Sequence, residues 1–88
     1  MVERTIVVTN RAGIHCRPAA ILVQAANSFK ANIYFEQGKR QINAKSIMGL
    51  LTLGATYGTE IKIVGDGEDE QQAVESIIRL CETNFEEE

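Results

Sequence analysis

The sequence contains no tryptophan, one proline, one histidine and only two cysteines. Two cysteines are too few for a disulfide scaffold, so we expect Cys16 and Cys81 to be free thiols in a reducing compartment. The longest uninterrupted apolar stretch runs from Pro18 to Val23, far short of the roughly 20 residues that span a bilayer. The first residues show no apolar segment typical of a signal peptide. We therefore expect a cytoplasmic protein without membrane insertion.

Basic residues are also scarce: nine Lys and Arg stand against twelve Asp and Glu, giving a formal net charge of −3. A nucleic-acid-binding protein normally has a basic face, so we expect no direct contact with nucleic acid. The hydrophobic fraction of 44% is ordinary for a globular protein and argues against intrinsic disorder. A chain this short supports one core, so residues 1–88 should form a single domain, and no feature demands anything but a monomer.

Hydrophobic periodicity predicts four strands and three helices. The strands are expected over residues 4–9, around Ile33 and Phe35, up to about Ile42, and over 60–64. The helices are expected over 16–29, over 46–53, and after Glu70 with a buried stripe made of Ala73, Val74, Ile77, Ile78 and Cys81. The acidic end, residues 86–88, should be a solvated and frayed terminus.

A tight turn around Gly38 joins the second and third strands, which must therefore run antiparallel. This excludes a doubly wound parallel sheet. The economical arrangement is an α+β fold, a two-layer open-faced β-sandwich of order β-α-β-β-α-β-α, in which a four-stranded antiparallel sheet carries three helices on one face.

The only histidine, His15, lies where the first helix is expected to begin. Pro18 suits the first helical turn and Gly13 permits an unusual backbone turn, so His15 should be at or next to the N-cap. The positive helix end favours a neutral imidazole. The same end, with the backbone N–H groups of Cys16 and Arg17, suits a phosphate, and the Arg17 guanidinium can bind a phosphoryl group in bidentate fashion.

Three other interpretations of His15 are weaker. A purely capping role is disfavoured because histidine is a poor N-cap compared with Ser, Thr, Asp or Asn. A Cys–His nucleophilic pair with Cys16 lacks a visible orienting group. A small metal chaperone would need more than His15 and Cys16, because two adjacent ligands without a third make a poor site.

The run from Gly13 to Ala20, followed by Lys45-Ser46-Ile47-Met48-Gly49, closely resembles the HPr family of the bacterial sugar phosphotransferase system. The resemblance extends over essentially the whole chain and implies the fold given above. It implies that the Nδ1 atom of His15 takes a phosphoryl group from phosphorylated enzyme I, which phosphoenolpyruvate charges, and that His15 passes this group to a sugar-specific enzyme IIA. It also implies that Arg17 stabilises the phosphoryl group. Such a protein is a carrier rather than an enzyme and needs neither cofactor nor metal.

The second motif places Ser46 at the start of the second helix, where a serine is an ordinary N-cap. The resemblance adds a regulatory role that is compatible with capping. In Gram-positive-type members, an HPr kinase/phosphorylase phosphorylates the matching serine, and the phosphoserine form can bind a catabolite-control transcription factor. A phosphate adds nearly two negative charges, whose effect would fall on the binding of partners.

The helix that begins after Ser46 is apolar nearly all round. One face of a two-turn helix cannot bury five apolar side chains, and we expect Leu50 and Leu53 to enter the core. The remaining side chains would form an exposed patch of the kind that docks partners. The resemblance implies docking of enzyme I and enzyme IIA at Ile47, Met48, Leu51 and Ala20.

The sequence departs from the family pattern at four positions, namely Ala12, Cys16, Gln24 and Asn27, which bears on partner affinity. Two related functions remain open. One is a regulatory HPr-like protein that acts mainly through phosphorylated Ser46, although such relatives lack the histidine. The other is a carrier in a nitrogen-type phosphotransfer relay.

Overall fold

The computed structural model describes residues 1–86 and contains the predicted elements in the predicted order. The acidic residues Glu87 and Glu88 lie outside the described residues. Among the described residues, no helix combines the length and apolar character needed to cross a bilayer. The elements are β1 (Val2–Val7), α1 (Cys16–Asn27), β2 (Asn32–Gln37), β3 (Arg40–Asn43), α2 (Ile47–Leu53), β4 (Glu60–Asp66), α3 (Glu70–Glu82) and a 3-10 turn, η1 (Asn84–Glu86).

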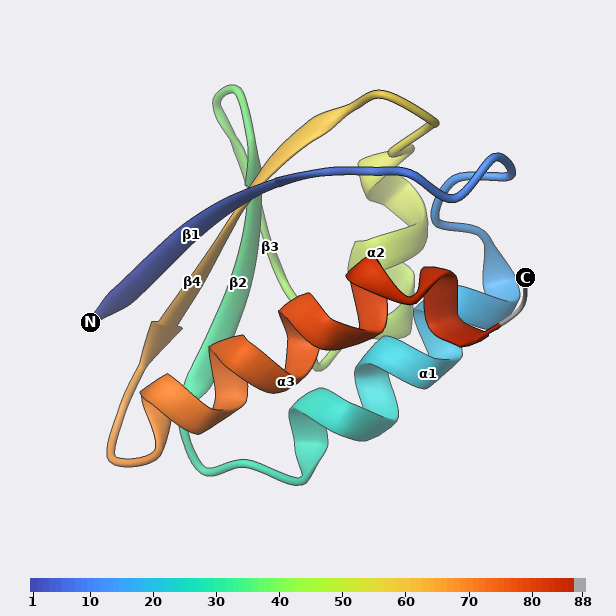
Figure 1. Ribbon diagram of the computed structural model, residues 1–88. Coiled ribbons are helices and arrows are strands. Elements are labelled where there is room, and N and C mark those ends of the chain that lie inside the picture. The colour runs from blue at the N-terminus through green and yellow to red at the C-terminus, as the bar shows by residue number, and fades with distance from the viewer. Residues whose placement is uncertain (87–88) are drawn as a thin grey trace.

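The four strands form one antiparallel sheet of order β1-β4-β2-β3. The turn between β2 and β3 is tight because Gly38 adopts a φ of 60°, a left-handed conformation that suits glycine. All three helices lie against one face of the sheet, with α1 and α3 side by side (Figure 1). The predicted α+β open-faced sandwich is therefore confirmed.

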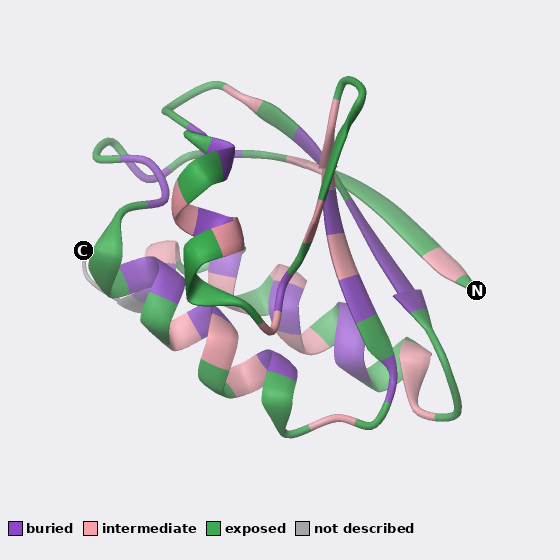
Figure 2. Cartoon of the chain, turned by 180° about the vertical axis from the view of Figure 1, so that it is seen from behind, coloured by how far each residue is buried: buried purple, intermediate pink, exposed green. Residues whose placement is uncertain are grey.

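The core lies between the sheet and the helices, where the buried residues of each element face one another (Figure 2). Strand alternation turns Ile33 and Phe35 of β2 inward and leaves both fully buried. Helix α3 buries Ala73, Val74, Ile77 and Cys81. The sequence pattern also predicts burial of Ile78, which is only half-buried because its helical position lies at the rim of this stripe.

Four predicted boundaries are wrong by two residues: β1 begins at 2 rather than 4 and ends at 7 rather than 9, α1 ends at 27 rather than 29, and β4 ends at 66 rather than 64. Hydrogen bonds explain the ends of β1 and α1. Strand β1 ends at Val7 because Val8 bonds to a loop instead of the β4 ladder: its N–H donates to Thr59 O (2.9 Å) and its carbonyl accepts from Gly58 N (2.8 Å). Helix α1 ends at Asn27 because the hydroxyl of Ser28 donates to the carbonyl of Ala25 at 2.6 Å, a local bond that competes with helix continuation.

The face of the sheet that no helix covers carries charges across three strands. Lys62 of β4 has Thr5 of β1 and Glu36 of β2 as its cross-strand partners. The Lys62 ammonium lies 3.8 Å from the carboxylates of both Glu3 and Glu36. These ion pairs are exposed, so each contributes little to the free energy of folding.

Asp69 connects the start of α3 to the loop between α1 and β2. Its two carboxylate oxygens accept hydrogen bonds from Lys30 N (2.9 Å) and Ala31 N (2.8 Å). These backbone N–H donors, the Lys30 amide first, hold the pKa of the Asp69 carboxyl below its usual value of 3.8, and the nearby Lys45 ammonium adds to the effect. The side chain therefore closes a contact between residues far apart in the sequence.

Replacement of this carboxylate should make the free energy of unfolding less dependent on pH in the acid range. Because folding lowers the Asp69 pKa, its contribution is complete above pH 3.8 and is lost as the pH falls through the lower value that the folded protein has. We expect Asp69→Asn to lower the urea midpoint at neutral pH, and the difference from the unmodified protein to shrink below pH 3.8. Glu68→Gln, the same charge change one residue earlier, should show no such pH-dependent difference. A difference that stays constant down to acid pH would contradict this assignment.

Candidate functional site

His15 is the N-cap of α1, as predicted. Its backbone is extended (φ −111°, ψ −165°), and its carbonyl accepts the first helical hydrogen bond, from Ala19 N at 2.9 Å. The imidazole makes no capping hydrogen bond to the helix, and the residue is exposed. The ring is thus held at a helix start by the backbone alone and faces the solvent with its nitrogens available for chemistry.

The first turn of α1, which follows His15 directly, carries groups that suit an anion. The N–H groups of Cys16 and Arg17 belong to the first turn, where no carbonyl lies four residues earlier in the helix. Pro18 is the third residue of the helix, is buried, and has no N–H to satisfy. Arg17 is exposed, as is the Cys16 thiol. The predicted residues of this segment are therefore gathered at one helix end.

The loop before α1 is packed against the loop after α2. Gly13 has a φ of 72°, which confirms the predicted need for glycine. The structure adds a second reason: a Cβ at this position would lie 2.5 Å from the carbonyl oxygen of Ala55. That same carbonyl accepts a hydrogen bond from Ile14 N at 2.9 Å. The chain immediately before His15 therefore depends on a segment about forty residues later.

The turn that leads to Gly13 is organised by Asn10, which the sequence pattern marks only as part of a strand break. Asn10 is the only buried polar residue among those described, 2% exposed. An Asn followed three residues later by Gly is a signature of a type I turn, and this signal was present in the sequence. Its burial under other elements could not be found from that local pattern.

Ser46 is the N-cap of α2, as predicted. Its hydroxyl oxygen accepts a hydrogen bond from Gly49 N at 3.1 Å, and its carbonyl accepts one from Leu50 N at 3.1 Å. Ser46 is exposed. The hydroxyl is therefore engaged in capping while remaining accessible from outside.

The apolar side chains of α2 divide nearly as predicted. Leu50 and Leu53 are buried, whereas Ile47 and Met48 are 40% and 67% exposed. Leu51 is only half-buried and packs against the core, so the expectation that it is exposed is partly wrong: it lies one turn after Ile47, at the rim of the buried face. We refer to Ile47, Met48 and Leu51 as the α2 patch.

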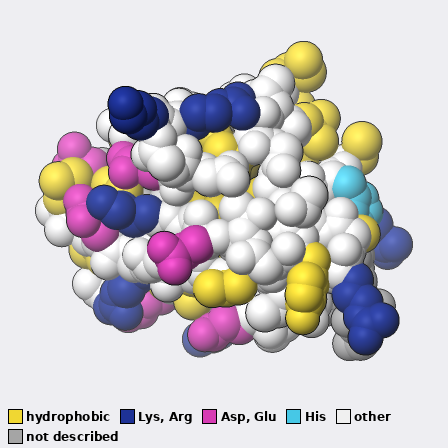
Figure 3. All heavy atoms as spheres, turned by 90° about the horizontal axis from the view of Figure 1, so that it is seen from above, with side chains coloured by type: hydrophobic (Ala, Val, Ile, Leu, Met, Phe, Trp, Pro, Cys, Tyr) yellow, Lys and Arg dark blue, Asp and Glu magenta, His cyan; other side chains and the backbone are white. Residues whose placement is uncertain are grey.

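The α2 patch and the histidine belong to neighbouring helices. Helices α1 and α2 pack against each other, and Ala20 is exposed on α1 one turn after Cys16. Beyond the end of α1, Lys45 joins the two helices: its Nζ donates to Phe29 O at 2.8 Å, and its carbonyl accepts from Asn27 Nδ2 at 3.4 Å. Seen from above, hydrophobic side chains gather beside the cyan histidine (Figure 3).

The two cysteines differ sharply in environment. Cys16 is exposed, whereas Cys81 is buried, and burial raises the pKa of the Cys81 thiol to about 12. Across residues 1–86, no three His, Cys, Asp or Glu side chains come together in a group that could hold a metal ion. His15 and Cys16 thus have no third ligand within the part of the chain that is described.

Comparison with known proteins places this geometry in a family. A family model described as the PTS HPr component phosphorylation site matches residues 2–83. The chain is 47% identical over 88 residues to the phosphocarrier protein HPr of Treponema pallidum (strain Nichols), with 100% of each chain covered. It is 43% identical over 77 residues to the HPr-like protein Crh of Bacillus subtilis (strain 168), which covers 88% of this chain and 91% of Crh. The crystal structure of HPr-C-His from Thermoanaerobacter tengcongensis has a TM-score of 0.96 and 42% identity, covering 100% of this chain and 99% of that one.

Two glycines with similar backbone angles separate the effect of backbone strain from that of close packing. Gly38 has a φ of 60°, and a Cβ added there would meet nothing within 4 Å, whereas the same atom at Gly13 would overlap Ala55 O. We expect Gly38→Ala to lower the free energy of unfolding by about 1–2 kcal/mol, from the left-handed conformation alone. Gly13→Ala should cost about 3 kcal/mol, since the overlap adds to the strain. Equal losses in urea titrations would show that the contact between Gly13 and Ala55 is not tight.

Proposed function

The chain belongs to the HPr family of the phosphotransferase system, and on that premise we propose that it is a phosphocarrier in which His15 is the phosphoryl acceptor and donor. In this proposal His15 receives the group from phosphorylated enzyme I, which phosphoenolpyruvate charges, and delivers it to a sugar-specific enzyme IIA. The observation that carries the proposal is the exposed imidazole at the start of α1, which makes no capping hydrogen bond.

The proposed transfer exchanges one bond to phosphorus for another. A lone pair on Nδ1 of His15 attacks the phosphorus atom held by enzyme I, the Nδ1–P bond forms, and the bond to the donor breaks with its electron pair returning to the donor. Delivery to enzyme IIA repeats the exchange in the other direction. Such transfers require little from a protein beyond positioning and charge stabilisation, so we assign this chain no enzymatic activity of its own and no cofactor.

The start of α1 supports both requirements. The positive end of a 12-residue helix lies where the phosphoryl oxygens would be, and the N–H groups of Cys16 and Arg17 belong to its first turn. The Arg17 guanidinium adds a permanent positive charge beside His15. These groups stabilise the phosphorylated state, while the exposure of the site leaves the phosphoryl group open to the next acceptor.

We assign docking of enzyme I and enzyme IIA to the α2 patch together with Ala20 of α1. The support is the exposure of Ile47 and Met48 on the helix that packs against α1. Methionine suits a surface that meets several partners because its side chain is unbranched and adaptable. Each partner would contribute the rest of an active site, so the carrier is proposed to work as a single copy of this domain. Its proposed compartment is the cytoplasm.

We further propose that phosphorylation of Ser46 regulates this docking. The hydroxyl is exposed and lies directly before Ile47 of the α2 patch. A phosphate there would add nearly two negative charges beside an apolar docking surface and repel acidic partners. By resemblance, an HPr kinase/phosphorylase would add the phosphate, and a catabolite-control transcription factor would recognise the modified protein.

A mainly regulatory protein of the Crh type is the second candidate function. It is favoured by the 43% identity to Crh of Bacillus subtilis and by the accessible Ser46 hydroxyl. The presence of His15 at a geometrically suitable helix start favours the relay instead. In both cases the α2 patch is the surface to which partners would bind.

Incubation with phosphoenolpyruvate and a cognate enzyme I should add one acid-labile phosphate to the protein. His15→Ala should abolish this adduct, because the chain contains no other histidine. Ser46→Ala should retain it, since Ser46 belongs to a different helix. Intact-mass spectrometry before and after mild acid treatment makes the measurement. A labile adduct that persists in His15→Ala would overturn the assignment.

Side-by-side reactions with enzyme I and with HPr kinase should distinguish the relay from the regulatory candidate. We expect an acid-labile adduct in the first reaction and an acid-stable one, lost in Ser46→Ala, in the second. The acid-stable form should then accept phosphate from enzyme I about tenfold or more slowly, since a charge beside the docking patch disfavours the encounter. Rapid labelling by the kinase with no labelling by enzyme I would favour the regulatory function.

A further inference from the structure

Asn10 uses both polar atoms of its buried side chain within its own turn. Its Oδ1 accepts from Ala12 N at 3.3 Å, and its Nδ2 donates to Gly13 O at 3.0 Å. Its backbone carbonyl also accepts from Gly13 N at 2.9 Å. The residue is only 2% exposed. Because the bond to Gly13 O is buried, water competes little with it, and it holds the turn firmly.

The bond from Asn10 Nδ2 falls on the peptide group that precedes His15 by one residue. The Gly13 carbonyl and the Ile14 N–H are the two polar ends of this single planar unit. Asn10 Nδ2 holds the carbonyl end, while the Ala55 carbonyl holds the N–H end at 2.9 Å. A peptide plane held at both ends cannot rotate without breaking one of the two bonds.

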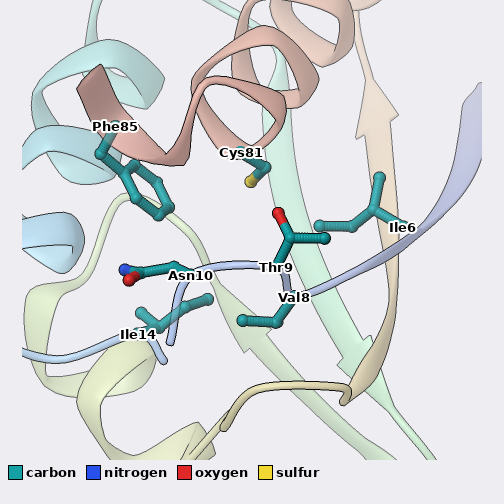
Figure 4. A pocket seen from close by; sticks show the side chains of 7 residues that line it. All are labelled: Ile6, Val8, Thr9, Asn10, Ile14, Cys81 and Phe85. Atoms are coloured by element: carbon teal, nitrogen blue, oxygen red, sulfur yellow. The ribbon is translucent and has the colours of Figure 1, made fainter. Parts of the chain in front are cut away.

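The C-terminal turn covers this arrangement. Phe85 of η1 is 6% exposed and lines the same small cavity as Asn10 and Ile14. Figure 4 shows the Phe85 ring lying over the Asn10 side chain, with Ile14 on the far side of the amide. The turn itself is tied to the chain next to Asn10 by a hydrogen bond from Thr9 Oγ1 to Asn84 Oδ1 at 2.8 Å. Residues from both ends of the described chain therefore enclose the amide.

We propose that Asn10 is a positioning residue for His15. By fixing the 13–14 peptide group against Ala55, it sets the direction in which the chain enters α1 and hence the direction of the imidazole, which makes no capping bond of its own. This proposal rests on the proposed phosphocarrier function. Asn10 does not touch the phosphoryl group; it acts through Gly13 and Ile14.

Two variants test the hydrogen bond that Asn10 Nδ2 donates to the Gly13 carbonyl. Asn10→Ala removes both side-chain bonds. Asn10→Asp keeps the size and the acceptor for Ala12 N but places an oxygen against the Gly13 carbonyl. We expect hydrogen exchange of the Ile14 amide, followed by NMR in the unphosphorylated protein, to become faster in both. In phosphoryl transfer from enzyme I, kcat should fall about tenfold or more, while KM should not change because the α2 patch is untouched.

A control variant that loosens the core elsewhere separates positioning from general loosening. Ile63→Val shortens a fully buried side chain in the central part of β4, away from the 10–14 turn. It should change neither the hydrogen-exchange rate of the Ile14 amide, compared with other amides of the same protein, nor kcat. The proposal is overturned by either of two outcomes: Ile14 exchange that matches this control, or normal kcat despite faster exchange. Recovery of both properties in Asn10→Asp would show that turn capping alone matters and would also overturn it. If the unmodified protein accepts no phosphate, the failure lies with the proposed function. The hydrogen-exchange data alone then test whether Asn10 holds the 13–14 peptide group in place.

Discussion

The hydrogen bond from the Ile14 N–H to the Ala55 carbonyl, at 2.9 Å, is the contact on which the geometry of the site depends. It joins the segment that leads into α1 to the segment that leaves α2. Glycine at position 13 makes the contact possible, because any Cβ would collide with the same carbonyl. The contact therefore ties the approach to His15 to the segment after α2, whereas Ser46, at the other end of α2, follows Lys45, whose carbonyl accepts from Asn27 Nδ2 at the end of α1.

The packing of α1 against α2 also bears on the proposed docking of several partners. Helices α1 and α2 contribute buried side chains to the core, while Ile47 and Met48 of the α2 patch remain exposed. The His15 ring and the exposed Ile47 and Met48 side chains are thus presented on neighbouring helices, outside the core. In the proposed function, His15 and Met48 lie far apart in the sequence but on helices that pack against each other, so a charge added at Ser46 would act on docking.

Local patterns in the sequence were sufficient for the order of elements and for the two helix starts. His15 and Ser46 were placed correctly because Gly13, Pro18 and the motif around Ser46 are local signals for helix ends. Contacts between distant residues were not predictable in this way. The burial of Asn10 requires Phe85, 75 residues later, and Asp69 finds its partners at Lys30 and Ala31. Hydrophobic periodicity in the sequence does not predict such pairings, because they form only when the helices pack against the sheet. The shift of Leu51 and Ile78 to the rim has the same cause, since the width of a buried stripe is set by the neighbour that covers it.

The uncovered face of the sheet has a consequence for how the molecule meets its surroundings. Bare sheet faces tend to stack on one another, but here an ammonium at Lys62 stands between the carboxylates of Glu3 and Glu36 in the middle of that surface. Pressing it against a second sheet would strip water from all three charges, and the two ion pairs, each 3.8 Å long, would not fully offset that desolvation. The uncovered face of the sheet is therefore charged and hydrated, and a fluorophore or surface tether attached to it would leave His15 and the α2 patch unobstructed.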